Sequence, residues 1–295
     1  MSTGQEASKK HLLSRLLIKT GGLIPVRLRK YLFIVATRLY YSLFQKRRLL
    51  ALYNLRLSFP EKTMDEIISI AKGAYRHVAV VASELFDIPR LTPDKIRDVV
   101  EIEGLENCRQ ALEKGKGIIL YTAHFGNWEL SAVALSYLLQ PLFVVYRPLD
   151  NAVLNNAISS LRTGAGNVLI PKERAMRQIL RSLQKNRIIG ILIDQNMARH
   201  EGVFVEYFSR LACTTDVVAK LAMRKQAAVI PAFCPRMPCG KYRLILGKAL
   251  ETIDTGNKQV DVKLNTQNYT RAIELMVRKY PEQWFWFHHR WKTRP

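Results

Sequence analysis

Short apolar runs rich in β-branched residues alternate with segments of helical periodicity along most of the chain. The runs at 117–123, 141–147, 167–171, 188–194, 228–234 and 242–250 predict strands, and the segments at 105–115, 127–139, 149–165, 174–186, 214–226 and 264–280 predict helices. Near-continuous apolar strands separated by helices are typical of an α/β fold with a mostly parallel central sheet flanked by helices. Ligands of such sheets bind beyond the carboxyl ends of the strands.

The N-terminal part has a different pattern. The apolar and aromatic run YLFIVATRLYYSLF at 31–44 is interrupted by Arg38 and has cations on both sides. It is shorter than the roughly 20 residues needed to cross a bilayer, and it starts too late to be a removable signal peptide. Aromatic residues beside cations favour a helix in the lipid headgroup region or a short tilted anchor, and a helix docked on its own domain is the alternative.

A further helix is predicted at 61–86, where apolar residues recur at helical spacing between Pro60 and Pro89. We therefore expect two parts. Residues 1–60 form a basic, membrane-associating helical segment, and residues 61–295 form one α/β domain.

The charge balance is the unusual feature of the composition. The chain has 46 Lys and Arg against 24 Asp and Glu, a net charge of +22, and residues 1–60 contain only one acidic residue, Glu6. Such an excess indicates an anionic partner, either nucleic acid or an acidic membrane surface. No helix-turn-helix, zinc finger or RNA-recognition motif supports nucleic acid. Because much of the charge flanks the apolar run, a membrane surface is favoured.

The cysteines and histidines indicate no metal site. Four cysteines in 295 residues do not make a disulfide framework, and the spacing of Cys234 and Cys239 is not usual for zinc. His288 and His289 are adjacent, so they rarely converge on one ion, and no spaced acidic or thiol partners stand out. We expect reduced thiols in a cytosolic compartment.

The stretch YTAHFGNWEL at 121–130 is the strongest candidate for chemistry. It follows a predicted strand and precedes a predicted helix, so His124 lies where this fold binds ligands. Gly126 permits a tight turn that can bring His124 and Glu129 together, and a carboxylate near an imidazole favours its action as a base. The alternative is a strand-end histidine satisfied by a backbone carbonyl, with Glu129 merely a favourable first-turn acid.

The HFGNWE motif resembles the H-x4-D/E block of the glycerolipid acyltransferase superfamily, and specifically the bacterial lipid A late acyltransferases. Further blocks of the resemblance are YNLRLSFPE at 53–61, VYRPLDN at 145–151, GILIDQN at 190–196, GVFVEYFSRLACTT at 202–215, IPAF at 230–233 and YPEQWFWFHHRWKTRP at 280–295. One departure is Tyr207-Phe208-Ser209, where the family often has two Phe followed by Gly.

This resemblance implies a reaction and roles for individual residues. His124 would be the general base that deprotonates an acceptor hydroxyl, and Glu129 would be the carboxylate that orients it. Arg147 would hold an acceptor phosphate or face the developing oxyanion, unless it is a surface arginine paired with Asp150.

Three further residues are candidates for substrate binding. Asp194 ends another strand on the same rim, where it would orient a basic residue or the pocket backbone, or cap an Asx turn. Arg162 matches a basic position of the family and is a weaker phosphate candidate. Asn127, a good helix N-cap, is placed in the same group.

The partners follow from the same resemblance. The donor would be acyl-acyl carrier protein and the acceptor a phosphorylated glycolipid, a lipid A precursor of the Kdo2-lipid IVA type, at the cytoplasmic face of a bacterial inner membrane. No cofactor is expected. Another lipid acceptor, such as a lysophospholipid or a glycosylated phosphatidylinositol, remains an alternative, as does a basic nucleic-acid binding protein. In the final block, Trp284 and Trp286 are expected to cover the sheet, with the cations after Phe287 facing anionic lipid.

Overall fold

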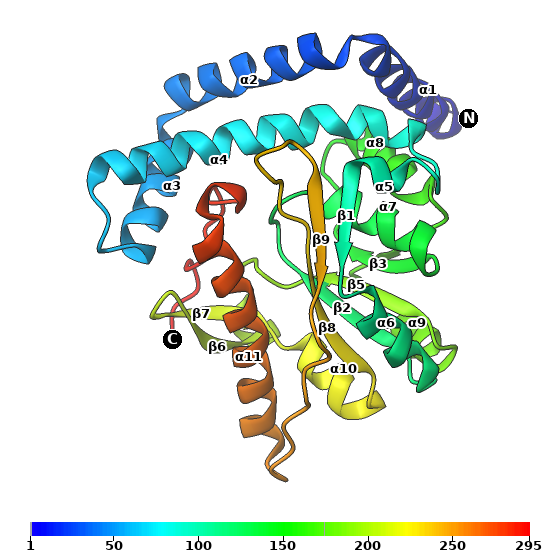
Figure 1. Cartoon of the computed structure of the whole chain (residues 1–295), viewed down its shortest axis with the longest axis vertical. Coiled ribbons are helices and arrows are strands. Elements are labelled where there is room, and N and C mark those ends of the chain that lie inside the picture. Colours follow the sequence, from blue (N-terminus) through cyan, green and yellow to red (C-terminus); the bar gives the residue numbers. More distant parts are fainter. Residues whose placement is uncertain (1, 174) are drawn as a thin grey trace.

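The computed structural model describes residues 2–173 and 175–295 and contains a central seven-stranded sheet between layers of helices (Figure 1). The strand order is β1-β9-β8-β2-β5-β3-β4, and all neighbours pair in parallel except β8 and β9. The predicted α/β fold with a mostly parallel sheet is therefore confirmed. The strands of this sheet are β1 Val100–Glu103, β2 Ile118–Thr122, β3 Leu142–Tyr146, β4 Val168–Pro171, β5 Ile188–Leu192, β8 Ala228–Phe233 and β9 Tyr242–Leu246.

The helices account for most of the remaining chain. They are α1 Ser2–Leu23, α2 Val26–Leu43, α3 Gln45–Ser58, α4 Met64–Glu84, α5 Ile96–Val99, α6 Leu105–Glu113, α7 Trp128–Leu138, α8 Ala152–Thr163, α9 Ala175–Gln184, α10 Val217–Lys225 and α11 Lys258–Lys279. Short 3-10 helices are η1 Leu85–Arg90, η2 Arg199–Glu201 and η3 Pro281–Gln283. Each predicted helix has a counterpart, but α11 begins six residues before the predicted start because Asn257 caps it there.

Both faces of the sheet are buried, as the apolar strand sequences require. Alternate residues of β2 illustrate this: Ile118 and Leu120 pack in one apolar cluster, and Ile119 and Tyr121 pack in the other. The first cluster includes residues of α6 and α7, and the second includes residues of α4, α9, α10 and α11. This two-sided burial leaves the carboxyl ends of the strands as the accessible edge.

Sequence periodicity did not predict β1 or a small antiparallel hairpin. The hairpin consists of β6 Gly202–Tyr207 and β7 Arg210–Thr215, and its two turn residues, Phe208 and Ser209, have φ values of +53° and +56°. A turn with two positive φ values usually contains glycine or asparagine. Here Phe208 is buried, its ring packs edge-on to Phe59, and its N–H donates to Glu274 at 2.7 Å, so tertiary contacts hold the turn.

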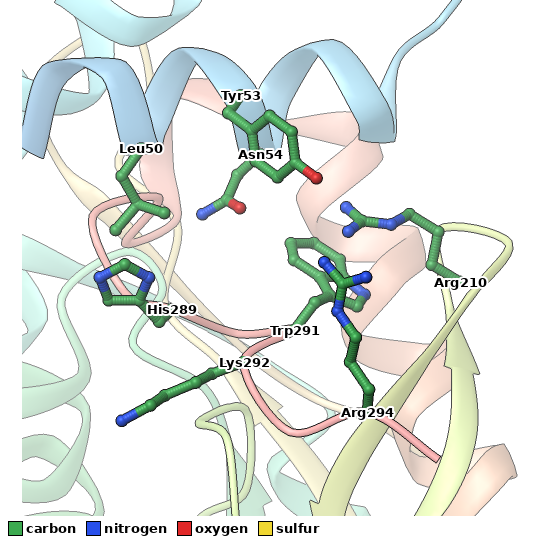
Figure 2. A pocket seen from close by; sticks show the side chains of 8 residues that line it. All are labelled: Leu50, Tyr53, Asn54, Arg210, His289, Trp291, Lys292 and Arg294. Carbon is green, nitrogen blue, oxygen red and sulfur yellow. The ribbon is translucent and has the colours of Figure 1, made fainter.

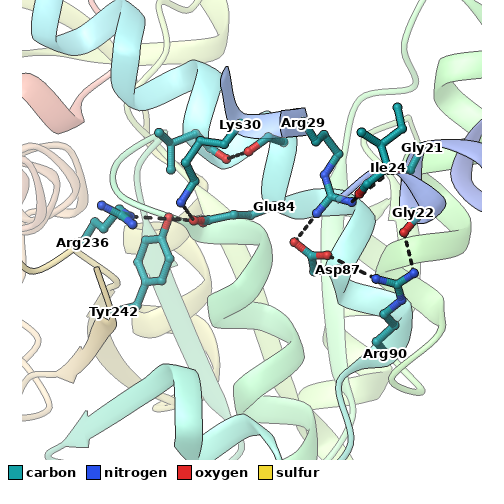
Figure 3. Close-up of polar contacts among 12 residues, drawn as sticks. Gly21, Gly22, Ile24, Arg29, Lys30, Glu84, Asp87, Arg90, Arg236 and Tyr242 are labelled. Carbon is teal, nitrogen blue, oxygen red and sulfur yellow. Dashed lines mark hydrogen bonds and ion pairs between the residues drawn. The ribbon is translucent and has the colours of Figure 1, made fainter. Parts of the chain in front are cut away.

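The N-terminal helices pack against the rest of the protein. Figure 1 shows α2 alongside α4 and α1 next to α8, and residue contacts confirm both pairings. The Arg29 side chain, 1% exposed, is central to this packing because it pairs with Asp87 and donates to the Gly21 carbonyl at 3.0 Å (Figure 3). Lys30 reaches Glu84 on α4 at 3.3 Å. The alternative prediction for residues 31–44, a helix docked on its own domain, is therefore correct for the side of α2 that packs on α4.

Among the helices of the described residues, none has the length and hydropathy required of a membrane span.

One contact of α4 positions the chain that follows β2. His77 Nε2–H donates to the Gly126 carbonyl at 3.1 Å. Burial lowers the pKa of His77 from 6.5 to about 4, and the hydrogen bond to Gly126 opposes this shift only in part. The imidazole of His77 is therefore neutral in the folded protein near neutral pH.

This shift makes stability depend on pH. Between pH 6.5 and about 4 the unfolded chain binds a proton at His77 that the folded protein does not, so stability falls as the pH falls. We expect His77 to contribute a loss of up to about 3 kcal/mol in the free energy of unfolding across this window. Urea unfolding of His77→Gln, whose amide can still donate, should show a smaller loss. The exposed His11→Gln serves as control, and an unchanged pH slope in His77→Gln would contradict the assignment.

Candidate active site

Two adjacent strands bring His124 and Asp194 together. In the parallel pair of β2 and β5, Thr122 lies opposite Leu192, and the ladder continues through a bond from Ile193 N to Thr122 O at 3.1 Å. His124 and Asp194 each lie two residues beyond these paired positions. Equal distances past neighbouring parallel strands place them side by side at the carboxyl edge of the sheet. Asp194 thus lies beside His124 at the predicted edge, but only His124 of the two lines the large cavity.

The Asp194 carboxylate is the hydrogen-bond partner of the His124 ring. His124 Nδ1 lies 2.8 Å from Oδ1, while Oδ2 accepts from the His124 backbone N–H at 2.9 Å and from Trp284 Nε1–H at 2.8 Å. Asp194 is only 4% exposed. Of the three roles considered for Asp194, these contacts correspond to orienting a basic residue and the pocket backbone.

These contacts determine the charge of the carboxylate. Burial alone raises the pKa of Asp194, but the proximity of His124 and the hydrogen bonds from His124 and Trp284 outweigh burial and lower this pKa below its ordinary value. An ionised Asp194 accepts a hydrogen bond from Nδ1–H of His124. In the neutral imidazole, Nε2 is then the nitrogen that carries the lone pair. The His124 side chain is 26% exposed and lines the large cavity of the protein.

The turn after His124 requires its glycine. Gly126 has φ +59°, and a Cβ at this position would lie 2.1 Å from the Cys234 carbonyl oxygen. The next residue, Asn127, donates its backbone N–H to the same carbonyl at 2.9 Å and caps α7 by accepting from Leu130 N–H at 3.0 Å. Asn127 is 2% exposed and does not line the large cavity. Its structural role is the helix cap, which corrects its placement among the substrate-binding residues.

Glu129 pairs with a different residue from the one expected. Arg162 on α8 reaches its two carboxylate oxygens at 2.6 and 2.8 Å, and Trp128 Nε1–H donates to it at 3.0 Å. No hydrogen bond between Glu129 and His124 is present in the described residues. Although both line the cavity, the pairing of His124 with Glu129 inferred from their spacing is replaced by His124–Asp194 and Glu129–Arg162. Spacing along the chain cannot reveal that α8 brings an arginine to Glu129.

The Glu129–Arg162 pair is bidentate and largely buried. Burial lowers the pKa of Arg162, but the hydrogen bonds and charge of Glu129 outweigh it, so the pKa of the guanidinium is raised above its ordinary value. Arg162, predicted as a phosphate ligand, thus uses two of its donors within the protein. The Arg162 guanidinium therefore stays charged in the cavity wall.

The cavity beside His124 has a volume of about 980 Å³. Most of its apolar lining residues are buried, whereas Arg147, Asp150, Lys172 and Glu201 are exposed and form its rim. The apolar lining residues include Leu120, Leu135, Leu142, Val144, Ile158, Ala175, Met176, Ile179, Ile191 and Ala232. The charged lining residues are Glu129, Arg147, Asp150, Arg162, Lys172, Glu201 and Asp216.

Two cations of the rim face solvent. The Arg147 side chain is 77% exposed and reaches Asp150 at 3.6 Å, so it lines the cavity and also makes the surface pairing that was the alternative to a binding role. Lys172, half-exposed, pairs with Glu201 at 3.1 Å. Sequence reasoning missed Lys172, and its only signal was its position directly after the strand at 167–171.

The C-terminal segment supports the loop after β5. Trp284 and Trp286 are buried in the core, as expected. Arg290, expected to face lipid, is instead 1% exposed, and its guanidinium donates to the carbonyls of Cys213 at 2.8 Å and Gln195 at 3.4 Å. Arg290 is therefore buried and does not face lipid, because it binds carbonyls whose position the sequence did not show.

Comparisons with known proteins place these features in a family. The family model described as bacterial lipid A biosynthesis acyltransferase matches residues 14–293. The lipid A biosynthesis palmitoleoyltransferase of Escherichia coli (strain K12) is 26% identical over 85% of this chain and 80% of its own length. The lipid A biosynthesis lauroyltransferase of the same strain is 27% identical over 85% of this chain and 81% of its own length.

A relative with a different acceptor in its name is also similar. The phosphatidylinositol mannoside acyltransferase of Mycolicibacterium smegmatis is 24% identical over 79% of this chain and 74% of its own length. The family match covers almost the whole chain, including both strand-end loops that form the site. The chain belongs to the bacterial lipid A biosynthesis acyltransferase family and is an acyltransferase.

Proposed function

We propose that this protein transfers a fatty acyl group from acyl-acyl carrier protein to a hydroxyl of a phosphorylated lipid A precursor of the Kdo2-lipid IVA type. The observation that carries the proposal is a His124 imidazole held by a buried carboxylate at the wall of a large cavity whose buried lining is mainly apolar. A base beside an apolar chamber suits a reaction in which an acyl chain is held while a hydroxyl attacks its carbonyl carbon.

The proton moves through His124 alone. Nε2 accepts the proton of the acceptor hydroxyl as the oxygen attacks the thioester carbonyl carbon, and the tetrahedral intermediate then expels the carrier thiolate. The imidazolium returns its proton to that thiolate, so the ester and the free thiol are the products and the base is regenerated. Asp194 keeps Nε2 directed at the cavity and stabilises the imidazolium while it carries the proton.

Glu129 acts at a different point of the site in this proposal. Its bidentate pair with Arg162 keeps two opposite charges fixed in the wall, where polar groups of an acceptor can bind against them. Exposed Arg147 and Lys172 at the rim suit the phosphate of an acceptor whose sugar hydroxyl enters the cavity. Of the two roles considered for Arg147, its exposure favours phosphate binding.

The net charge of +22 suits both substrates. The acyl carrier protein is acidic and the acceptor carries phosphate, so each is attracted to a basic surface. No nucleic acid is needed to account for the charge.

We further propose that the protein associates with the cytoplasmic face of a bacterial inner membrane through its N-terminal helices. On α1, Leu12 is 69% and Leu16 53% exposed, and on α2, Tyr31 is 64% exposed. Exposed leucines and tyrosines interspersed with Lys and Arg suit adsorption to an anionic leaflet. The same helices are anchored to the body by Arg29, so the whole protein would be held at the lipid surface.

Variants at the two pairs test the mechanism. His124→Ala should reduce kcat by about 10²-fold to 10⁴-fold, the contribution typical of a positioned base. Asp194→Asn should cause a similarly large loss and shift the pH profile of kcat, because the amide cannot stabilise the imidazolium. Glu129→Gln should keep that profile while lowering the rate. If Glu129→Gln shifts the profile and Asp194→Asn does not, Glu129 is the orienting carboxylate.

Purified protein and defined substrates test the acceptor and the donor. We expect acyl transfer from acyl-acyl carrier protein to Kdo2-lipid IVA, detected by mass spectrometry, and less transfer from acyl-CoA. The phosphatidylinositol mannoside relative motivates that lipid as the second candidate acceptor. Faster acylation of the mannoside than of the lipid A precursor would replace the proposed acceptor while retaining the reaction class.

Sedimentation with vesicles tests the membrane proposal. Leu12→Gln/Leu16→Gln should lower the fraction of protein that sediments with vesicles containing anionic lipid, since each substitution removes an exposed apolar side chain. The matched control is Leu264→Gln/Leu275→Gln, which changes exposed leucines on α11. Equal sedimentation of the two double variants would show that α1 does not carry the interaction.

A further inference from the structure

A second, smaller cavity lies apart from the reaction site. It has a volume of about 180 Å³ and is enclosed by α3, the start of β7 and the C-terminal segment (Figure 2). Figure 2 shows the guanidinium groups of Arg210 and Arg294 on the same side of this cavity. Its lining residues are Leu50, Tyr53, Asn54, Arg210, His289, Trp291, Lys292 and Arg294, none of which lines the larger cavity.

The polar lining of the small cavity consists mainly of hydrogen-bond donors. Arg210, Lys292 and Arg294 supply cationic groups, and no acidic side chain is among the lining residues. In the part of the chain that the structure describes, none of the three forms an ion pair with Asp or Glu. Three cations around one small space repel one another unless an anion joins them.

Two buried donors at this cavity have no acceptor among the described residues. They are Arg210 Nη1 and Trp291 Nε1, and Trp291 is only 8% exposed. Leaving a buried donor without an acceptor destabilises the folded protein, so such donors normally have one. Burial, and to a smaller extent the charge of Arg294, also lower the pKa of the Arg210 guanidinium, although the neighbouring Tyr53 opposes this shift in part. The chemistry that satisfies all these groups is a multiply accepting anion such as a phosphoryl group.

The outer side of α3 indicates what the phosphoryl group is attached to. Tyr53, which lines the cavity, is 53% exposed, and the same helix face continues through Leu49, 59% exposed, and Leu57, 37% exposed. An exposed apolar stripe beside a cationic recess matches a molecule with a phosphate head and acyl chains. We propose that this cavity binds the phosphate headgroup of an anionic phospholipid, with its acyl chains against the α3 stripe of Leu49, Tyr53 and Leu57.

The C-terminal segment lies between this site and the reaction site and contacts both. Lys292 and Arg294 line the small cavity, whereas Thr293 between them bonds with Asn196, a residue of the large cavity, at 3.0 Å in both directions. A phospholipid in the small cavity would thus lie next to the catalytic loop without occupying it. The inference does not depend on the proposed acyl-transfer reaction.

Calorimetric titration of the full chain tests this site. The probes are dihexanoyl phosphatidic acid, which is soluble, inorganic phosphate, and dihexanoylglycerol, which lacks phosphate. We expect saturable binding of the phosphatidic acid, weaker binding of inorganic phosphate and none of dihexanoylglycerol. Lys292→Gln/Arg294→Gln should weaken the phosphatidic acid by about tenfold or more, because two charge-assisted contacts are lost. Both side chains are exposed, so this variant should fold.

Control variants separate the possible outcomes. Arg109→Gln removes an exposed cation on α6 and should leave the affinity unchanged. Leu49→Gln should weaken phosphatidic acid but not inorganic phosphate. Arg147→Gln should also leave the affinity for phosphatidic acid unchanged, because Arg147 lines the large cavity and not the small one. Unchanged affinity in Lys292→Gln/Arg294→Gln would overturn the site, and equal affinity for phosphatidic acid and inorganic phosphate would overturn the lipid assignment.

Discussion

The buried carboxylate of Asp194 connects the parts of the chain that form the candidate active site. An ionised group at 4% exposure is tolerated only where donors replace its water, and it has three N–H donors, from the ring and backbone of His124 and from Trp284. Backbone bonds reinforce this connection, since Phe285 N–H donates to His124 O at 3.1 Å and Gly126 N–H to Gln283 O at 2.9 Å. The C-terminal segment is therefore as much part of the site as the strand-end loops.

The two carboxylates of the site, Asp194 and Glu129, have different hydrogen-bond partners. Asp194 is bound to a group that can lose its proton, whereas Glu129 is bound to Arg162, which does not titrate near neutral pH. In the proposed reaction, Asp194 stabilises the proton that His124 gains, whereas the Glu129–Arg162 pair takes no part in proton transfer.

The sequence was sufficient for features that depend on local pattern and not for those that depend on tertiary neighbours. Apolar runs located the six predicted strands, and HFGNWE located the edge of the sheet where His124 lies beside Asp194. Strand β1 is only four residues long, and the β6–β7 turn uses Phe208 and Ser209 where a pattern search expects glycine. The partner of Glu129 also required the position of α8, which no spacing within the motif encodes.

The distribution of arginines argues that the positive charge has two separate uses. Arg29 and Arg290 are each 1% exposed and bind backbone carbonyls, so they connect distant segments and are absent from the surface. Arg147 and Arg294 are exposed beside the large and small cavities, respectively. A net charge therefore overstates the attraction of the surface for anions, and only the exposed cations next to a cavity can select one. Thr293 lies between two residues of the small cavity and bonds with Asn196 in the loop after β5. Anions bound at the two cavities would therefore both lie next to residues 292–294 or their direct contacts.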